Sequence, residues 1–152
     1  MRRVPTGAHI FLVMSRATRA MEARAVRSIA HTGLGTSDFA VLEALLHKGP
    51  LPVNVLGKKV LLTSGSMTAA VDRLTERGLV ARSDDPHDRR VRVVALTPDG
   101  RRLIKPAFAR HEDDLEEVVS VLTREERVTL VELLRKLGTH IDDTIDELEE
   151  AS

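Results

Sequence analysis

The chain has 152 residues, 42% of them hydrophobic, which suits one domain or one small domain with a helical extension. It contains no cysteine, tryptophan or tyrosine, which excludes thiol chemistry and cysteine-ligated zinc and disfavours base stacking on aromatic platforms. The 23 basic and 23 acidic residues cancel only in total: residues 1–30 hold six arginines and one glutamate, whereas residues 112–152 hold four basic and fourteen acidic residues.

The first predicted element is an amphipathic helix over residues 6–30. Apolar residues recur there at helical spacing, with arginines on the other face. Charged residues interrupt this segment, so it contains no apolar run of the signal-peptide or transmembrane type. We therefore expect a cytoplasmic protein without a membrane partner.

Three short helices are predicted next. The first follows a candidate cap at Thr36 or Ser37 and ends at residues 48–50. The second covers residues 52–59, and the third runs from a cap at Thr63 or Ser64 to residue 77, where Gly78 stops it. The residues of the third helix expected to face inward are Met67, Ala70, Val71 and Leu74. A tight connection before the third helix indicates a helix-turn-helix.

A basic hairpin follows this helix-turn-helix. Residues 79–83 and 91–97 are predicted to pair as strands around a polar loop with Pro86 at its tip. A helix followed by a basic hairpin is typical of a winged helix-turn-helix, which places a helix in the major groove of double-stranded DNA and an arm in the minor groove. Thr97 and Pro98 then begin a long helix, and a capping box at residues 123–126 begins the last one.

The expected fold is mainly α with a small two- or three-stranded β-wing, flanked by long N- and C-terminal dimerisation helices. We treat residues 1–152 as a single domain, with a winged-helix DNA-binding lobe at about 34–100 and a helical dimerisation region at about 6–31 and 98–150. The last helix has an apolar stripe near heptad spacing that can be buried only against the other terminal helix or a second copy. We favour a homodimer, which would present two recognition helices to a two-fold symmetric site.

Two motifs carry a resemblance to a known family. The wing pattern Asp-x-Arg-x-x-x-(Leu/Val)-x-Leu-Thr is matched by Asp88, Arg90, Val94, Leu96 and Thr97, and the recognition-helix pattern by residues 66–68, 71–74 and 77–80. In these motifs the chain resembles the MarR family of bacterial transcription factors, over nearly its whole length. The resemblance departs at residues 69 and 70, both alanine, where many relatives carry arginine.

The resemblance implies a dimeric winged-helix regulator, often a repressor, that occupies a palindromic operator. Many such proteins release DNA when a small, commonly aromatic or phenolic, ligand binds. Residues 41–51 and 63–68 are similar to a subgroup that responds to quinone or catechol-type compounds.

Arg90 is the leading candidate for insertion into the minor groove, because a narrow groove has enhanced negative potential. We expect Asp88 to hold the Arg90 guanidinium, and Arg89 and Arg92 to assist at phosphates. A surface ion pair between Asp88 and Arg90 with little energetic value is the alternative.

The start of the recognition helix is the second candidate DNA-contacting region. Thr63, Ser64 and Ser66 lie where backbone amides and the helix dipole attract phosphate, although one of them must cap the helix. Ser66 and Thr68 could also reach base edges.

Further cations near this helix have two interpretations each. Arg73 could contact phosphate or pair with the nearby Asp72 or Glu76. Lys58 and Lys59 could likewise reach phosphate.

A small phenolic or quinone-like effector would bind where the first, second and fifth helices meet. Its candidate contacts are Phe11, Met14, Arg16, His31 and His111, and core packing explains the apolar members equally well. We expect no cofactor and no metal, because the histidines lack metal-site spacing.

Two rival functions remain open at this point. A winged-helix protein that has lost specific DNA binding could serve as a protein-interaction module, an idea that Ala69 and Ala70 support. An enzyme needs a nucleophile with a base, a metal constellation or a phosphate loop. The sequence has none of these, so we predict that the chain is not an enzyme.

Overall fold

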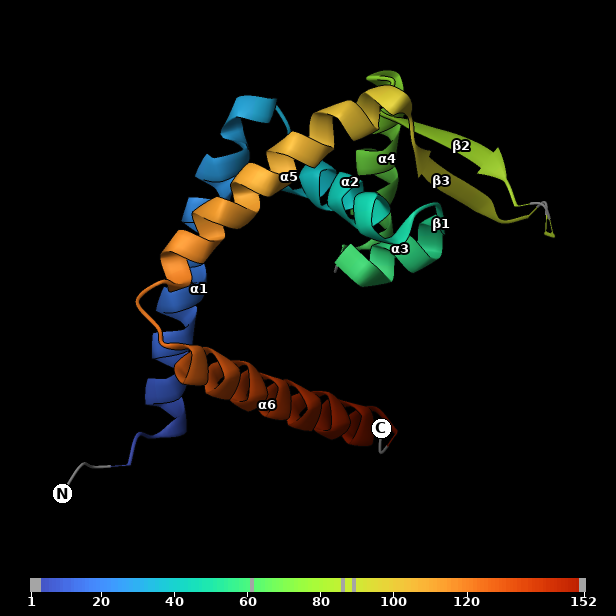
Figure 1. Ribbon diagram of the computed structural model, residues 1–152. Helices are drawn as coiled ribbons and strands as arrows, with labels where there is room; N and C mark the ends of the chain where they lie inside the picture. The colour runs from blue at the N-terminus through green and yellow to red at the C-terminus, as the bar shows by residue number, and fades with distance from the viewer. Residues whose placement is uncertain (1–3, 61, 86, 89, 151–152) are drawn as a thin grey trace. The chain divides into compact units, whose positions relative to one another are not determined.

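The computed structural model describes residues 4–60, 62–85, 87–88 and 90–150, with side chains up to residue 142 (Figure 1). Its elements in chain order are α1 (Gly7–Ile29), the 3-10 turn η1 (Ala30–Thr32), α2 (Thr36–Lys48), β1 (Leu51–Pro52), α3 (Val53–Val60), α4 (Ser64–Glu76), β2 (Val80–Asp84), β3 (Arg92–Leu96), α5 (Pro98–Val119) and α6 (Arg124–Glu150). The chain forms two compact units, one up to Leu115 and one from Glu116 onward. The prediction of a mainly α fold with a small wing is confirmed.

The wing is a three-stranded antiparallel sheet in the order β1-β3-β2. β2 and β3 pair from Val80 opposite Leu96 to Asp84 opposite Arg92 and extend away from the helices (Figure 1). The helix predicted over residues 52–59 is wrong at its start, and β1 was not predicted: Pro52 pairs with β3, and α3 begins one residue later. A two-residue edge strand tolerates a proline because it has few ladder hydrogen bonds to lose.

Three of the predicted helix caps are confirmed and one is wrong. The Thr63 hydroxyl accepts the Ser66 amide at 3.2 Å, the Thr97 hydroxyl accepts the Gly100 amide at 3.0 Å, and Thr123 forms a reciprocal capping box with Glu126. The second helix, however, has Gly35 as its N-cap without a side-chain hydrogen bond, so Thr36 and Ser37 lie inside its first turn.

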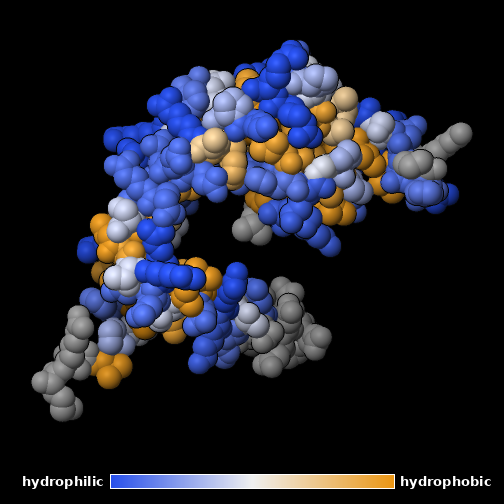
Figure 2. Space-filling view, in the orientation of Figure 1, coloured by the Kyte–Doolittle hydropathy of each residue, from blue (hydrophilic) through white to orange (hydrophobic). Residues whose placement is uncertain are grey.

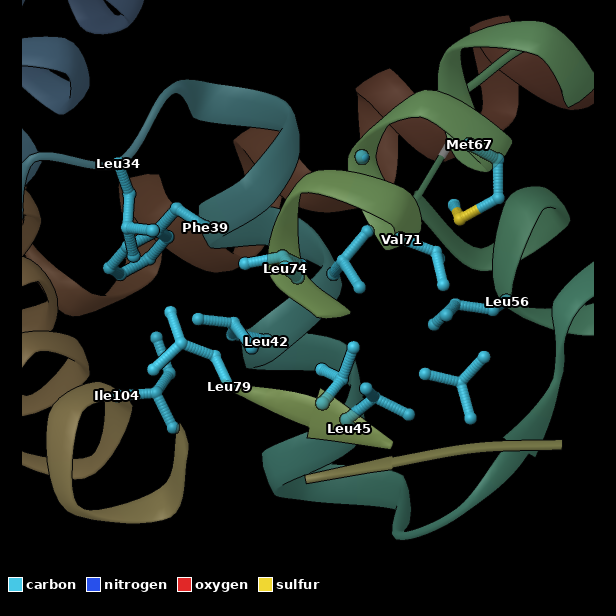
Figure 3. Close-up of a cluster of buried hydrophobic side chains, with 14 of the residues drawn as sticks. Leu34, Phe39, Leu42, Leu45, Leu56, Met67, Val71, Leu74, Leu79 and Ile104 are labelled. Carbon is cyan, nitrogen blue, oxygen red and sulfur yellow. The ribbon is translucent and has the colours of Figure 1, made fainter. Parts of the chain in front are cut away.

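The core is mainly aliphatic, with Phe39 as a buried aromatic member, and joins α2, α3, α4, the wing and the first half of α5 (Figure 3). Its most deeply buried large side chains include Leu42, Leu45, Leu56, Met67, Leu74 and Ile104. The four residues predicted to face inward from α4 are all buried, as the 3.6-residue period requires. This core fixes α4 against α2 and the sheet.

The end of α4, both long strands and the start of α5 meet at one junction. Gly78 adopts the left-handed conformation with φ 68°, and the amides of Gly78 and Leu79 donate back to the carbonyls of Thr75 and Leu74, a Schellman motif. Thr97 then donates its amide to the Leu79 carbonyl at 3.1 Å and its hydroxyl to the Gly78 carbonyl at 2.7 Å. The geometry therefore links the orientation of α4 to the wing.

Gly100 is required by the same junction. A Cβ atom at this position would lie 1.9 Å from the Leu79 carbonyl oxygen, a backbone atom that cannot rotate away.

We predict that Gly100→Ala lowers the free energy of unfolding by about 1–3 kcal/mol, as overpacking in a core does. Urea denaturation followed by circular dichroism measures it. Gly7→Ala is the matched control, since a Cβ atom added at Gly7 would meet no other part of the chain within 4 Å. Equal stability of the two variants would contradict the requirement for glycine at position 100.

Candidate nucleic-acid interface

One groove joins α3, α4 and the wing, with a volume of about 930 Å³. Its polar lining from α4 and the wing comprises Ser64, Thr68, Asp72, Arg82, Arg90 and Arg92, and α3 adds Asn54 and Lys58. The groove therefore brings residues of the predicted recognition helix and of the predicted wing into one concave surface.

The N-terminus of α4 is organised by hydroxyl groups. Thr63 caps the helix and donates its hydroxyl to Ser66 Oγ at 3.0 Å. The Thr68 hydroxyl donates to the Ser64 carbonyl at 3.0 Å. Ser64 and Thr68 line the groove, while Ser66 is exposed at the start of the helix. All four predicted hydroxyl residues thus lie on the first turns of α4.

The two alanines at which the sequence departs from many relatives have different environments. Ala70 is fully buried in the core, whereas Ala69 is exposed. Of these two positions, only position 69 could therefore place a side chain in contact with a bound molecule.

Arg73 lies at the other end of α4 and pairs with neither of the partners predicted for it. Its guanidinium makes two hydrogen bonds to Asp38 of α2, at 2.6 and 3.3 Å, although 35 residues separate them in sequence. The hydrogen bond and charge of Asp38 raise the pKa of Arg73. Arg73 and Asp38 line a second hollow with Arg77, whose guanidinium donates to the Gly33 carbonyl. The structure thus gives Arg73 a bond between helices and does not bring it to the groove of Arg90.

Two aspartates shape the wing tip through backbone hydrogen bonds. The Asp85 carboxylate accepts the amides of His87 at 2.8 Å and Asp88 at 3.1 Å, and these bonds lower its pKa. Asp88 in turn accepts the Arg90 amide at 2.9 Å. The expectation that Asp88 holds the guanidinium is therefore corrected: Asp88 fixes the backbone of Arg90. Arg89 and Pro86, also predicted at this tip, lie outside the described residues.

The arginines of the groove differ in their partners. Arg82 pairs with Asp72 and Arg92 pairs with Asp84, each at 2.5 Å. The second pair follows from the sheet register, which sets Asp84 opposite Arg92. Arg90 is exposed, and among the described residues its guanidinium has no partner. Among the described residues of the wing, Arg90 therefore faces the groove without an acidic partner.

The predicted effector residues do not form one cluster within this chain. Phe11, Met14 and Arg16 lie in the first half of α1, and Phe11 is 74% exposed. Met14 precedes Ser28 by fourteen residues, which along an α-helix is about 21 Å.

His31 and His111, in contrast, both meet Ser28. The His31 ring contacts the Ser28 carbonyl at 2.9 Å, and His111 Nδ1 lies 2.5 Å from Ser28 Oγ. Because the Ser28 hydroxyl donates to the Ala25 carbonyl, His111 Nδ1 acts as the donor to Ser28 Oγ. The His111 ring also lies 5.0 Å from the Phe39 ring.

Sequence reasoning missed two buried polar residues, Ser28 and Asp38. Ser28 resembles any serine of an amphipathic helix, and Asp38 resembles an ordinary acidic residue in a first helical turn. Only the tertiary contacts with His111 and Arg73 reveal their roles.

The described residues contain no group of three or more His, Asp or Glu side chains arranged to hold a metal ion. His47, four residues after Glu43, packs edge-on against the Phe108 ring at 4.6 Å between centroids. Over the part of the chain that the structure describes, no helix has the length and apolar character needed to cross a membrane.

Known proteins are similar to this chain in sequence and in fold. Residues 32–91 match the sequence model of the MarR family. The chain is 40% identical over 129 residues to the HTH-type transcriptional regulator MhqR of Bacillus subtilis, covering 85% of this chain and 89% of that protein.

Two solved structures are similar to the described fold. BpsR of Bordetella bronchiseptica, whose DNA binding is regulated by 6-hydroxynicotinic acid, is 32% identical with a TM-score of 0.76, covering 85% of this chain and 98% of that one. A mutant of MarR from Escherichia coli in complex with operator DNA has the same fold, with a TM-score of 0.76 at 24% identity, covering 84% of this chain and 92% of that one.

MhqR is a transcriptional regulator and BpsR binds DNA, which agrees with the prediction that the chain is not an enzyme. The chain has a helix-turn-helix and a three-stranded wing, and it is 40% identical to a transcriptional regulator over most of both chains. The protein therefore belongs to the MarR family of winged-helix, DNA-binding transcriptional regulators.

Proposed function

We propose that the protein is a homodimeric, effector-responsive repressor that binds a palindromic operator, with α4 in the major groove and the wing tip in the adjacent minor groove. The observation that carries this proposal is the groove shared by α4 and Arg90. A guanidinium without a protein partner is available to the negative potential of a narrow minor groove. The hydroxyl-rich start of α4 faces the same groove, at the end from which such helices contact bases.

The apolar faces of α1 and α6 favour a second copy of the chain as the partner. The exposed large hydrophobic residues of these helices are Ile10, Phe11, Leu12, Val13, Met21 and Val26 on α1, and Val128, Leu130, Val131, Leu133, Leu134 and Ile141 on α6. Figure 2 shows that apolar side chains reach the surface in several places among the hydrophilic ones. Monomeric proteins rarely expose contiguous apolar patches of this kind. A two-fold dimer would bury them and repeat the DNA-binding groove.

An effector would act near Ser28, where His31 and His111 meet beside the Phe39 ring. The regulation of BpsR by a hydroxylated aromatic acid supports a ligand of that class. The resemblance of residues 41–51 and 63–68 to a subgroup that responds to quinone or catechol-type compounds favours a phenolic or quinone-like effector. Catechol and 6-hydroxynicotinic acid are the first probes to test for release of DNA.

The direct test of the proposal is fluorescence anisotropy on duplexes tiled across the upstream region of the protein's own gene. We expect one tile to remain bound at physiological salt against competitor DNA, with the affinity falling steeply as salt rises because phosphate contacts release counterions. Absence of binding to every tile and to random-sequence DNA at low salt would contradict the proposal and favour the protein-interaction module.

The role of Arg90 is tested by Arg90→Ala. We expect the affinity for the bound tile to fall about tenfold or more at constant salt, since a base- or groove-contacting arginine contributes about 1–3 kcal/mol. Arg102→Ala is the matched control, because Arg102 is an exposed arginine of α5 already paired with Asp99. Thermal unfolding should show that both variants remain folded, and equal affinities would remove Arg90 from the interface.

The dimer is tested by placing charge on α6. Leu133→Lys, at a side chain that is 60% exposed in the single chain, should convert a dimer into a monomer in light scattering coupled to size exclusion. Val55→Lys alters an exposed valine of α3 and should leave the dimer intact. A wild-type chain that elutes as a monomer at micromolar concentration would refute the assembly.

A further inference from the structure

The surface that α4 presents beside the wing carries small side chains over its first two turns. Ser64, Thr68 and Asp72 follow one another at four-residue spacing and line the groove, and Ala69 is exposed next to Thr68. No arginine, lysine, asparagine or glutamine occurs in α4 before Arg73. The helix therefore lacks the long side chains that make bidentate hydrogen bonds to guanine or adenine.

Two of the polar groups on this face already have partners within the protein. The Thr68 hydroxyl donates its only hydrogen to the Ser64 carbonyl oxygen at 3.0 Å. Asp72, which could otherwise accept from cytosine, holds Arg82 at 2.5 Å. The exposed residues Thr68 and Ala69 each also carry a methyl group.

The major-groove edge of DNA offers one apolar feature, the 5-methyl group of thymine, and contact with threonine or alanine methyl groups is its usual mode of recognition. We propose that α4 recognises thymine 5-methyl groups through Thr68 and Ala69, so that each operator half-site carries thymine where the first two turns of α4 enter the groove. This inference rests on the proposed DNA-binding function. It makes Thr68 and Ala69 specificity-determining residues, with Arg90 acting in the other groove.

Deoxyuridine differs from thymidine only in lacking this methyl group, so it isolates the contact. The probe is the highest-affinity duplex selected from randomised DNA, prepared with thymidine or with deoxyuridine at every thymidine position and compared by anisotropy at fixed salt. Burial of a methyl group corresponds to about a fourfold change in affinity. We expect the deoxyuridine duplex to bind at least about fourfold more weakly to the wild-type protein.

Variants of Thr68 identify the protein side of the contact. Thr68→Val keeps the methyl group and removes the hydroxyl, and it should retain the thymidine preference. Thr68→Ser keeps the hydroxyl and removes the methyl group, and it should reduce that preference to near twofold or less. Thr75→Ser is the matched control, because Thr75 makes the same hydrogen bond to the carbonyl four residues earlier in α4 but does not line the groove; its thymidine preference should equal that of the wild type.

Three results would overturn the inference, and they differ in what else they overturn. Equal affinity of the wild type for the two duplexes, with specific binding preserved, would refute methyl recognition while leaving the proposed operator binding intact. Selection that yields no preferred duplex would overturn both. A thymidine preference that survives in Thr68→Ser but disappears in Thr68→Val would assign recognition to the hydroxyl group and refute the role given to the methyl group.

Discussion

The groove depends on the close approach of Gly100 to the Leu79 carbonyl, where α5 begins against the start of the wing. There is no room for a Cβ atom at this point, and Thr97 hydrogen-bonds to the carbonyls of both Gly78 and Leu79. The same few residues therefore end α4, begin β2 and join β3 to α5. Because these elements are tied together by backbone contacts, α4 and the wing hold a fixed relation, which a protein needs if it is to enter two adjacent grooves of one duplex.

The arginines near the junction of α4 and the wing fall into two groups. One group holds α4 in place, and the other lies in the wing. Arg73 and Arg77 bind the beginning of α2 and the Gly33 carbonyl, so they hold the far end of α4 in place. Asp72 of α4 and Asp84 of β2 compensate the wing arginines Arg82 and Arg92. Asp88 accepts a backbone amide, and the guanidinium of Arg90 has no partner among the described residues. The pairing of Arg82 and Arg92 also limits repulsion between the cations of the groove.

The sequence predicted those features that depend on local signals. The start of α4 at a hydroxyl cap, its stop at Gly78 and its buried face at Met67 and Leu74 follow from capping and periodicity. Features that depend on contacts distant in sequence were missed or misassigned: Asp38 as the partner of Arg73, and Ser28 as the meeting point of His31 and His111. The wing motif specifies that Asp88 and Arg90 are present but not which of their atoms interact. The hydrogen bond from the Arg90 backbone amide to Asp88 is therefore seen only in the structure.

The central claim is that α4 and the wing occupy adjacent grooves of one duplex. Paired chemical footprints of the operator complex test it most directly, with dimethyl sulfate reporting on guanine N7 in the major groove and hydroxyl radicals reporting on the sugars along the minor groove. Our account predicts protection in both grooves in each half-site, and selective loss of the minor-groove protection in Arg90→Ala at saturating protein. Protection confined to one groove in the wild-type complex, or unchanged minor-groove protection in the variant, would contradict it.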